Sequence, residues 1–230
     1  MITGASIGIG KGIAQAFAKE GAKLVITARN QERLDVTANE LRSHGTPVLS
    51  VVADVSKEAQ VIALFRKTMQ EFGRLDILVN NAGIYEEAAL EETSLEMWQR
   101  IIDVDLTGPF LCTREAMKIM KPQRAGRIIN IGSIAAQMPR PKAAAYSCAK
   151  IGIVALTKTT ALEGRPFGVV ASCLHPGNVD TAQMADFPNE PMISVDDLVK
   201  AVVTMAALPL NVNMLEAIVM PSVQPYLGRG

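Results

Sequence analysis

The sequence of 230 residues has few of the residue types that build disulfide frameworks or metal centres. Its three cysteines, Cys112, Cys148 and Cys173, are an odd number without a C-x-x-C spacing, so neither a disulfide framework nor a zinc site is indicated. Two histidines, His44 and His175, are too few for a histidine-rich metal centre. We therefore expect no bound metal.

A net charge of one sign and long apolar runs are also absent. The 23 basic and 23 acidic residues cancel, which leaves no electrostatic footprint for nucleic acid or for an anionic membrane surface. Charged residues interrupt every apolar run before it reaches the length of a bilayer span, and the glycine-rich start lacks the layout of a signal peptide. Aromatic residues make up only 4%, but 49% hydrophobic and 20% charged residues exclude a disordered chain. These features predict a soluble, cytoplasmic globular protein without nucleic-acid or membrane partners.

Short apolar runs alternate along the chain with longer amphipathic stretches. The short runs are β-branched and apolar on both faces, which is typical of buried parallel strands. The predicted strands are 23–28, 47–53, 75–79, 127–131, 169–174 and 216–220. The predicted helices are 9–20, 31–44, 57–72, 95–120 with a break, 146–163 and 195–207. Without a linker or repeat, this alternation predicts an α/β fold, with residues 1–230 as one Rossmann-type domain around a doubly wound parallel sheet of six to seven strands.

Small residues mark the expected helix ends. Gly21, Gly45 and Gly73 each follow a predicted helix and would end it. Ser56 and Ser194 stand where helix N-caps are expected.

The first strand is the weak point of this prediction, because only Met1 and Ile2 precede the first glycine turn. That strand would lie in the middle of the sheet. Strands are spaced ~4.8 Å apart, so its loss would leave a gap of about 10 Å with unpaired backbone on both sides. We expect a truncated first strand, and a natural protein with several more apolar residues upstream or a different start codon.

A glycine-rich turn, TGASIGIG at Thr3–Gly10, leads from that strand into the first helix. Glycines let the backbone turn tightly and approach a phosphate, and the new helix offers unpaired N–H groups to it. The G-x-x-x-G-x-G spacing differs from the G-x-G-x-x-G fingerprint, and such turns also occur for structural reasons. Because a strand follows the helix, we favour nucleotide binding.

The end of the second strand bears on the choice of cofactor. It reads Ala28-Arg29-Asn30, without the carboxylate that would bind the ribose 2′-OH of NAD. The Arg29 guanidinium can instead bind a 2′-phosphate, which favours NADP over NAD. The alternative is a solvated loop arginine, and Ile7 adds no second basic residue from the glycine turn.

Polar residues follow the next two strands as well. Asp54 could accept a hydrogen bond from the adenine amino group, with Val55 packed on the ring, but Asp54 is equally suited to helping cap the next helix. The segment Asn80–Gly83 (NNAG) follows the fourth strand, at the sheet edge where ligands collect. Its alternative role is that of a simple turn.

Tyr146 and Lys150 are spaced i, i+4 on a predicted helix and therefore share one face. A tyrosine has a pKa near ~10, and a neighbouring cation favours its phenolate. Such a phenol can give a proton to a carbonyl oxygen or take one from an alcohol. Ser133, at the end of the fifth strand, could hold the same oxygen. The Y-x-x-x-K pattern alone also fits an ordinary amphipathic helix.

The ordered set of T-G-x-x-x-G-x-G, N-N-A-G, a serine thirteen residues before Y-x-x-x-K, and a later Pro-Gly resembles the short-chain dehydrogenase/reductase family, in its compact single-domain form. The resemblance spans the chain from Thr3 to the C-terminus. It implies an enzyme that transfers hydride between a nicotinamide and a small carbonyl or secondary-alcohol substrate. It also implies that Ser133, Tyr146 and Lys150 are the catalytic residues.

The same resemblance assigns the cofactor contacts to the glycine turn, the strand ends and the segment after the sixth strand. The assigned residues are Gly4, Ser6, Ile7, Gly8, Ile9, Arg29, Asp54, Val55, Asn81, Ala82, Gly83, Tyr146, Lys150, Pro176, Gly177, Val179 and Thr181.

Asp105 departs from the family pattern, in which an asparagine completes a catalytic tetrad and its main-chain carbonyl holds a water. A carbonyl survives this replacement, but a buried carboxylate needs a partner or a proton. We place Asp105 with the catalytic residues and expect activity to persist, with the proton relay and its pH dependence open.

The substrate pocket should be walled by residues 134–143, 83–88 and 183–191, and residues 180–193 resemble the mobile lid of the family. The expected apolar wall residues are Ile84, Tyr85, Met138, Pro139, Met184 and Phe187. The charged residues Glu86, Glu87, Arg140 and Lys142 either form a rim or are simply solvated. We interpret His175 as a loop residue beside a turn rather than a substrate contact.

Helices 108–120 and 146–163 carry more apolar residues than one sheet face needs. In the family these helices pair with a second subunit, and the tail, here 224–227, meets another, so a homodimer or homotetramer is expected. A thick monomeric core is the alternative. Two rival functions remain: a nucleotide-binding scaffold that is catalytically impaired, and a truncated isoform without activity.

Overall fold

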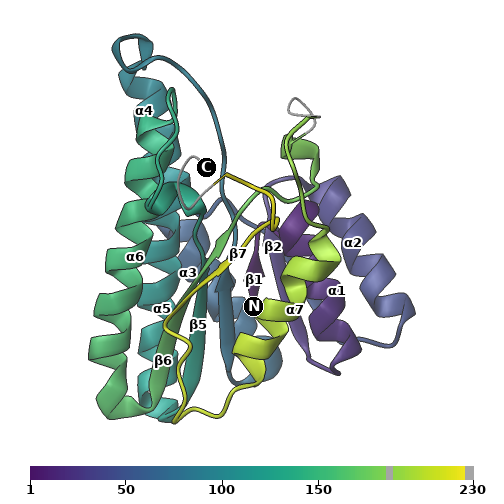
Figure 1. Ribbon diagram of the computed structural model, residues 1–230. Coiled ribbons are helices and arrows are strands. Elements are labelled where there is room, and N and C mark those ends of the chain that lie inside the picture. Colours follow the sequence, from purple (N-terminus) through teal and green to yellow (C-terminus); the bar gives the residue numbers. More distant parts are fainter. Residues whose placement is uncertain (185–188, 226–230) are drawn as a thin grey trace.

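The computed structural model describes residues 1–184 and 189–225, and a parallel sheet forms its centre (Figure 1). The strand order is β3-β2-β1-β4-β5-β6-β7. In chain order the strands are β1 (Ile2–Thr3), β2 (Leu24–Ala28), β3 (Val48–Val52), β4 (Ile77–Asn80), β5 (Gly126–Ile131), β6 (Val169–Pro176) and β7 (Glu216–Val219). This is the predicted α/β fold with a doubly wound sheet.

Helices cover both faces of the sheet. They are α1 (Gly8–Lys19), α2 (Gln31–Ser43), α3 (Glu58–Phe72), α4 (Leu95–Ile102), α5 (Gly108–Gln123), α6 (Ala144–Gly164) and α7 (Val195–Ala207). Helices α1, α2 and α7 pack on one face around Ile13, Leu34 and Leu198, all fully buried. Helices α3 and α5 cover the other face, around Leu64 and Ala116, with α6 beside α5. No helix within 1–184 and 189–225 is long and apolar enough to cross a membrane.

The predicted gap at the first strand is not present over the residues described. Ile2 and Thr3 pair in parallel with Ile26 and Thr27 of β2, and Ile2 also pairs with Val79 of β4. The main-chain oxygen of Met1 accepts a hydrogen bond from Val79. The central position of the sheet is therefore filled by a strand of two residues, shorter than its neighbour β2.

The helix ends follow the predicted signals with one exception. Gly21, Gly45 and Gly73 all adopt positive φ just after α1, α2 and α3, as C-terminal glycines do. Ser194 caps α7 by accepting a hydrogen bond from the Asp197 N–H at 3.0 Å. The prediction for Ser56 is wrong, because α3 begins after Lys57, and Ser56 instead donates to Asp54.

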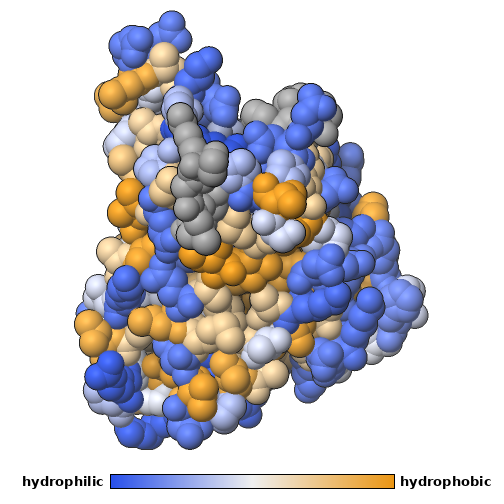
Figure 2. Space-filling model, in the orientation of Figure 1, coloured by the Kyte–Doolittle hydropathy of each residue, from blue (hydrophilic) through white to orange (hydrophobic). Residues whose placement is uncertain are grey.

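The sheet edges differ from the buried strands that the sequence predicts. On β3 only Val51 is buried, and no residue of β7 is buried. Leu215 and Ile218 are about two-fifths exposed, and Figure 2 shows apolar side chains gathered over the region where β7 lies in Figure 1.

The predicted break within 95–120 is a π-helical turn. It covers Asp103–Thr107 (η2) and joins α4 to α5 without an intervening loop. The extra residue in this turn changes which side chains face the sheet. Val104 and Asp105 are buried as a result.

A buried polar ladder ties the sheet to the helices behind it. Asn80 of β4 donates to Thr113 of α5 at 3.1 Å and to Asn130 of β5 at 2.8 Å. Asn130 in turn donates to Thr157 of α6 at 2.8 Å. These hydrogen bonds fix α6 against the carboxyl half of the sheet.

Candidate active site

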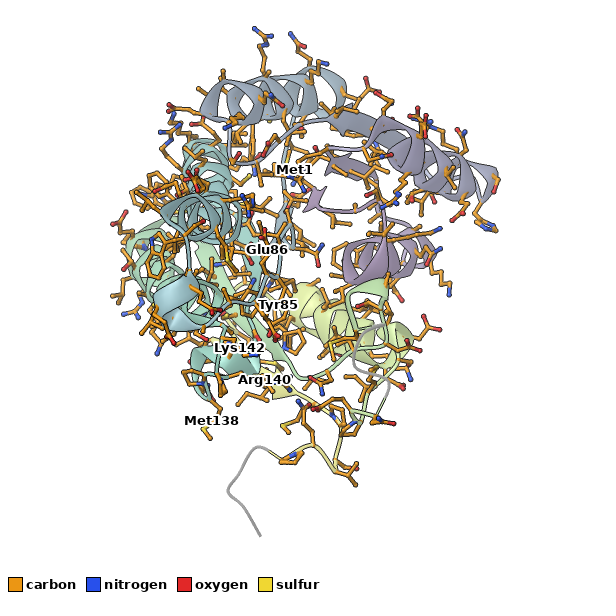
Figure 3. The ribbon with its side chains drawn as sticks, turned by 90° about the horizontal axis from the view of Figure 1, so that it is seen from above. Met1, Tyr85, Glu86, Met138, Arg140 and Lys142 are labelled. Atoms are coloured by element: carbon orange, nitrogen blue, oxygen red, sulfur yellow. The ribbon has the colours of Figure 1, made fainter. Side chains whose placement is uncertain are left out.

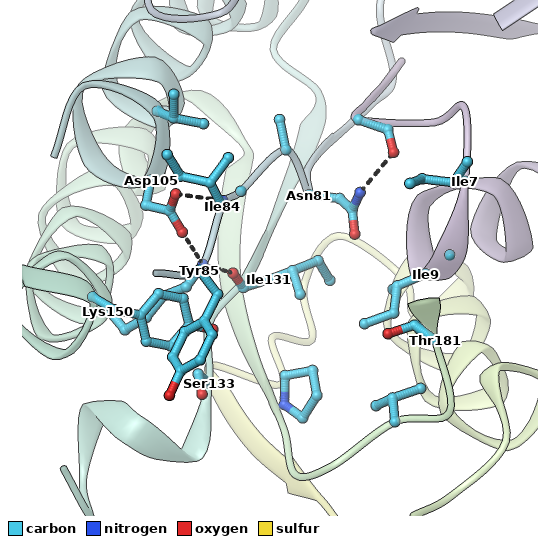
Figure 4. Close-up of a pocket in the computed structure, with 18 of the residues that line it drawn as sticks. Ile7, Ile9, Asn81, Ile84, Tyr85, Asp105, Ile131, Ser133, Lys150 and Thr181 are labelled. Atoms are coloured by element: carbon cyan, nitrogen blue, oxygen red, sulfur yellow. Dashed lines mark hydrogen bonds and ion pairs between the residues drawn. The ribbon is translucent and has the colours of Figure 1, made fainter. Parts of the chain in front are cut away.

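A cavity of about 410 Å³ opens at the carboxyl ends of the strands, where the strand order reverses between β1 and β4. This is where open α/β sheets bind ligands. Every residue that the sequence assigned to catalysis or to the cofactor lies in its wall, from Gly4 to Thr181. In Figure 4, Asp105, Lys150 and Ser133 lie on one side of the cavity, and Ile7, Ile9 and Thr181 lie on the other.

The glycine turn fits a diphosphate by its shape. Gly4 and Gly8 have φ values of +64° and +56°, which glycine adopts without strain. A side chain on Gly10 would lie 2.3 Å from the main-chain oxygen of Gly4, so the turn closes tightly. Ile7 precedes α1 without a side-chain cap, and the first turn of α1 carries no acidic residue. The N–H groups at the N-terminus of α1 are thus available to bind an anion.

Asn81 holds this turn against β4. Its side-chain amide donates to the main-chain oxygens of Thr3 at 3.0 Å and Gly4 at 3.1 Å. Figure 4 draws one of these two hydrogen bonds. Ala82 lies close enough that a side chain on Gly4 would come within 2.8 Å of its Cα. Asn81 thus has a structural role as well as its place in the cavity wall.

Two arginines stand at the end of the cavity beyond β2. Arg29 follows the strand directly, and Arg33 lies one helical turn later in the first turn of α2; both are exposed. Sequence reasoning missed Arg33, because in the sequence it is one more polar residue at the start of a predicted helix. Asn30 caps α2 by accepting from the Arg33 N–H.

The end of β3 presents Asp54 and Val55 to the same part of the cavity. One carboxylate oxygen of Asp54 accepts hydrogen bonds from the N–H and the hydroxyl of Ser56. Asp54 therefore orders the turn before α3 while it lines the cavity, so its two predicted roles are compatible.

The reacting end of the cavity is built by α6 and the end of β5. Tyr146 and Lys150 share one face of α6, with the Lys150 Nζ 5.2 Å from the centroid of the Tyr146 ring. The ring of Tyr85 meets that of Tyr146 edge to face at 5.0 Å. Ser133 follows β5, and its hydroxyl accepts a hydrogen bond from the Ala135 N–H. A phenol, an ammonium and a hydroxyl therefore line one end of the cavity.

Asp105 meets Lys150 behind this end of the cavity. Its Oδ2 lies 3.2 Å from the Lys150 Nζ, and its Oδ1 accepts from the Ile84 N–H at 2.8 Å (Figure 4). Burial raises the pKa of the Asp105 carboxyl, against the opposing effects of Lys150 and the Ile84 N–H. Burial alone would lower the pKa of Lys150, but the charge of Asp105, with a smaller effect of Tyr146, raises it overall.

His175 lies in a strand and not in the predicted loop. It is part of β6, pairs with Ile218 of β7 and is fully buried. Its Nδ1 lies 2.8 Å from the main-chain oxygen of Ser133, and its Nε2 lies 3.1 Å from Glu216. The imidazole therefore supports the end of β5 from behind.

The substrate wall matches the prediction only in part. Ile84, Tyr85 and Met184 line the cavity as expected, and Arg140 lines it too. The remaining residues named for the wall or rim do not line the cavity or lie outside the described residues: Glu86, Glu87, Met138, Pro139, Lys142 and Phe187.

Charges and exposure explain these differences. Met138 is 51% exposed and lies at the outer edge in the view from above (Figure 3). Glu86 forms an ion pair with Arg100, and Arg140 donates to Asn178 at 3.1 Å. Arg140 is therefore the charged residue that the loop after β5 brings to the cavity.

The chain is similar to known proteins in sequence and in overall structure. The family model of the short chain dehydrogenases matches residues 1–191. The chain belongs to the short-chain dehydrogenase family. This short-chain dehydrogenase is 41% identical over 194 residues to a 3-oxoacyl-[acyl-carrier-protein] reductase of Synechocystis, covering 84% of this chain and 78% of that protein. It is 39% identical to glucose 1-dehydrogenase 2 of Bacillus subtilis, covering 83% of this chain and 75% of that protein.

A solved structure extends the similarity to the whole chain. An alcohol dehydrogenase of the archaeon Thermococcus sibiricus, described as complexed with 5-hydroxy-NADP, superimposes with a TM-score of 0.89 at 32% identity. The match covers 100% of this chain and 97% of that one. This short-chain dehydrogenase is thus an NAD(P)-dependent oxidoreductase that acts on CH–OH or carbonyl groups of small molecules.

Proposed function

We propose that this short-chain dehydrogenase is NADP(H)-dependent and interconverts a ketone or aldehyde with an alcohol, with Tyr146 as the general acid and base. The observation that carries the proposal is the pair on α6, where a buried ammonium lies beside a phenol that faces the cavity. A bound nicotinamide cofactor would supply or accept the hydride.

Each of the three residues has a distinct role in this proposal. Tyr146 gives its proton to the carbonyl oxygen during reduction, or takes the hydroxyl proton during oxidation. The Lys150 charge stabilises the phenolate that reduction leaves behind. The Ser133 hydroxyl donates a hydrogen bond to the same substrate oxygen and so orients it.

Arg29 and Arg33 support NADP over NAD. Both guanidiniums stand at the cavity end beyond β2, and neither forms an ion pair with another residue in 1–184 or 189–225. Two free cations suit a dianionic 2′-phosphate better than a ribose hydroxyl. The glycine turn and α1 would hold the diphosphate, and residues 176–181 would lie beside the nicotinamide.

We also propose that residues 1–230 act as one catalytic domain in the cytoplasm, within a homodimer or homotetramer. Helices from both halves of the chain pack on one sheet, and the three cysteines form no disulfide. Phe110, Ile151 and Leu162 leave apolar surface exposed on α5 and α6, the helices that the family resemblance assigns to subunit contact.

The decisive experiment is the substitution Tyr146→Phe. With NADPH and a panel of ketones, we expect kcat to fall by about 10²–10⁴-fold, the usual contribution of a general acid. NADPH binding, measured by fluorescence, should remain. The control is Cys148→Ser, which changes an exposed side chain two residues along α6 and should leave turnover unchanged. Binding of NADPH without any turnover by the wild type would favour a scaffold instead.

A further inference from the structure

The Asp105 side chain is enclosed by the π-helical turn that carries it, by α6 and by the segment after β4. It is fully buried on the π-helical turn, and the Lys150 side chain is 7% exposed. Lys150 also donates to the main-chain oxygen of Ile131 at 3.3 Å. A side chain on Gly83 would come within 2.9 Å of the Asp105 Oδ2, so this glycine makes room for the carboxylate.

The contacts of the two carboxyl oxygens favour the ionised form. Oδ1 already accepts the Ile84 N–H. Oδ2 has no hydrogen-bond partner in the part of the chain that the structure describes, and it lies 3.2 Å from the Lys150 ammonium. A proton on Oδ2 would therefore find no acceptor there, whereas a negative charge finds a cation at 3.2 Å.

We propose that the Asp105 carboxylate withholds part of the Lys150 positive charge from Tyr146, which favours the phenol over the phenolate and adapts this site to carbonyl reduction. The inference rests on the proposed function, since it concerns the proton that Tyr146 carries. Asp105 acts through Lys150 and not on the substrate, so it is a positioning residue. The neutral asparagine that the family resemblance leads one to expect at this place would leave the ammonium charge unopposed.

The other ionisable groups around the pair do not compensate for Asp105. Burial raises the pKa of the Cys173 thiol on β6 to about 12, so that thiol stays neutral. The Tyr85 hydroxyl is hydrogen-bonded to Glu87, and burial raises the pKa of this phenol as well. The Arg140 guanidinium forms an ion pair with Glu190 at 3.8 Å, so its charge is already opposed by a carboxylate.

The remaining charged groups near Lys150 contact one another and not the Asp105–Lys150 pair. Glu216 contacts His175 at 3.1 Å and Lys158 at 3.6 Å. Within 1–184 and 189–225, Asp105 is the only carboxylate in an ion pair with Lys150.

The effect on Tyr146 can be measured in the protein without cofactor or substrate. Ultraviolet difference titration reports tyrosinate, and subtracting the same titration of a Tyr146→Phe protein isolates Tyr146. Asp105→Asn should move this titration midpoint by about one pH unit to lower pH, as removal of a nearby unit charge does at an effective dielectric constant of about 20. The matched control is Asp103→Asn, two residues earlier, whose carboxylate bonds Gln99 and should move nothing.

Kinetics provide an independent readout. For alcohol oxidation, the acid limb of the pH profile of kcat/KM should move to lower pH by a similar amount in Asp105→Asn and stay in place in Asp103→Asn. If Asp105→Asn does not fold, Asp105→Ser removes the same charge with a smaller side chain and carries the same expectations.

A titration midpoint that does not move in a folded Asp105 variant overturns the inference, because Asp105 would then be neutral or electrostatically remote from Tyr146. A shifted midpoint in a protein without turnover on any substrate would sustain the electrostatic inference while the proposed oxidoreductase activity fails. The two failures are therefore separable.

Discussion

The imidazole of His175 and the main chain of Ser133 are joined directly, with Nδ1 2.8 Å from the Ser133 oxygen. The other ring nitrogen faces Glu216, whose side chain also accepts from Gln137 and lies near Lys158. The backbone of Ser133 is therefore contacted by a buried ring whose second nitrogen lies 3.1 Å from a carboxylate. Buried polar groups arranged in this way are costly to disturb.

Replacement of His175 by alanine should destabilise the protein. The change leaves a cavity in the interior and removes one of the two groups that contact the Ser133 oxygen, the other being the Ala136 N–H, so we expect a loss of about 2–4 kcal/mol in the free energy of unfolding. Urea unfolding followed by circular dichroism measures this loss. His44→Ala, at an exposed position, should change stability by less than about 0.5 kcal/mol. Equal stabilities of the two variants would show that the contact with Ser133 contributes little.

Replacement of Arg29 or Arg33 by alanine should weaken NADPH binding and leave NADH binding nearly unchanged. Each lost charge-assisted contact to the 2′-phosphate is expected to raise the Kd for NADPH about tenfold, or about 1.4 kcal/mol. Fluorescence titration with both cofactors measures the change, and Arg66→Ala on the exposed side of α3 is the charge-matched control. If both variants bind NADPH as tightly as the wild type, neither arginine determines a preference for NADPH over NADH.

Replacement of Gly10 by alanine should break the glycine turn. The new methyl group would lie 2.3 Å from the Gly4 oxygen and 2.4 Å from the Asn81 amide nitrogen, so the turn or Asn81 must move. We expect a cost of about 3 kcal/mol or more and loss of cofactor binding. Gly21→Ala is the comparison, since its φ is +78° but nothing lies within 4 Å of the added carbon, and it should cost only about 1–2 kcal/mol. A Gly10→Ala protein that binds NADPH normally would contradict the tight-turn geometry.

Stability should fall at alkaline pH because of two buried thiols. Burial raises the pKa of Cys112 and Cys173 from 9.0 to about 12, so the folded protein keeps both protons while the unfolded chain releases them. The stabilisation is complete below pH 9.0 and is lost as pH rises from 9.0 towards about 12, by up to about 1.4 kcal/mol per pH unit for each thiol.

Urea unfolding at a series of alkaline pH values measures this slope. Cys112→Ala and Cys173→Ala should each flatten it, while Cys148→Ala, at an exposed thiol, should not. A slope that is the same in all three variants would contradict the assignment to the buried thiols.

The elements that the sequence predicted well are those whose signals are local. Helix α7 was predicted at its observed bounds, since Ser194 supplies a cap and the apolar period continues without a break. The break in 95–120 was foreseen, but no propensity distinguishes a π turn from a loop. The extra residue brings Asp105 within 3.2 Å of Lys150 on α6, a long-range contact that a local sequence pattern does not show.

The predictions that were wrong or incomplete also failed because they depend on contacts between distant parts of the chain or on the exact start of a helix. His175 was predicted to lie in a loop beside a turn, after a strand ending at residue 174, but pairing with β7 extends β6 through His175 and Pro176. Ser56 does not cap α3, because the helix begins after Lys57 and the Ser56 hydroxyl donates to Asp54. Arg33 looks like any polar residue on a helix, and only the direction of α2 relative to the cavity gives it a possible role.

The ladder from Asn80 through Asn130 to Thr157 also limits how α6 can move. Sliding α6 by one helical turn, ~5.4 Å, would separate Thr157 from Asn130 and leave polar groups unpaired in a dry interior. An apolar interface would tolerate such a slip at lower cost, since one methyl group can replace another. The helix that carries Tyr146 is thus registered on the sheet before any ligand arrives, and little binding energy need be diverted to bring the phenol into place.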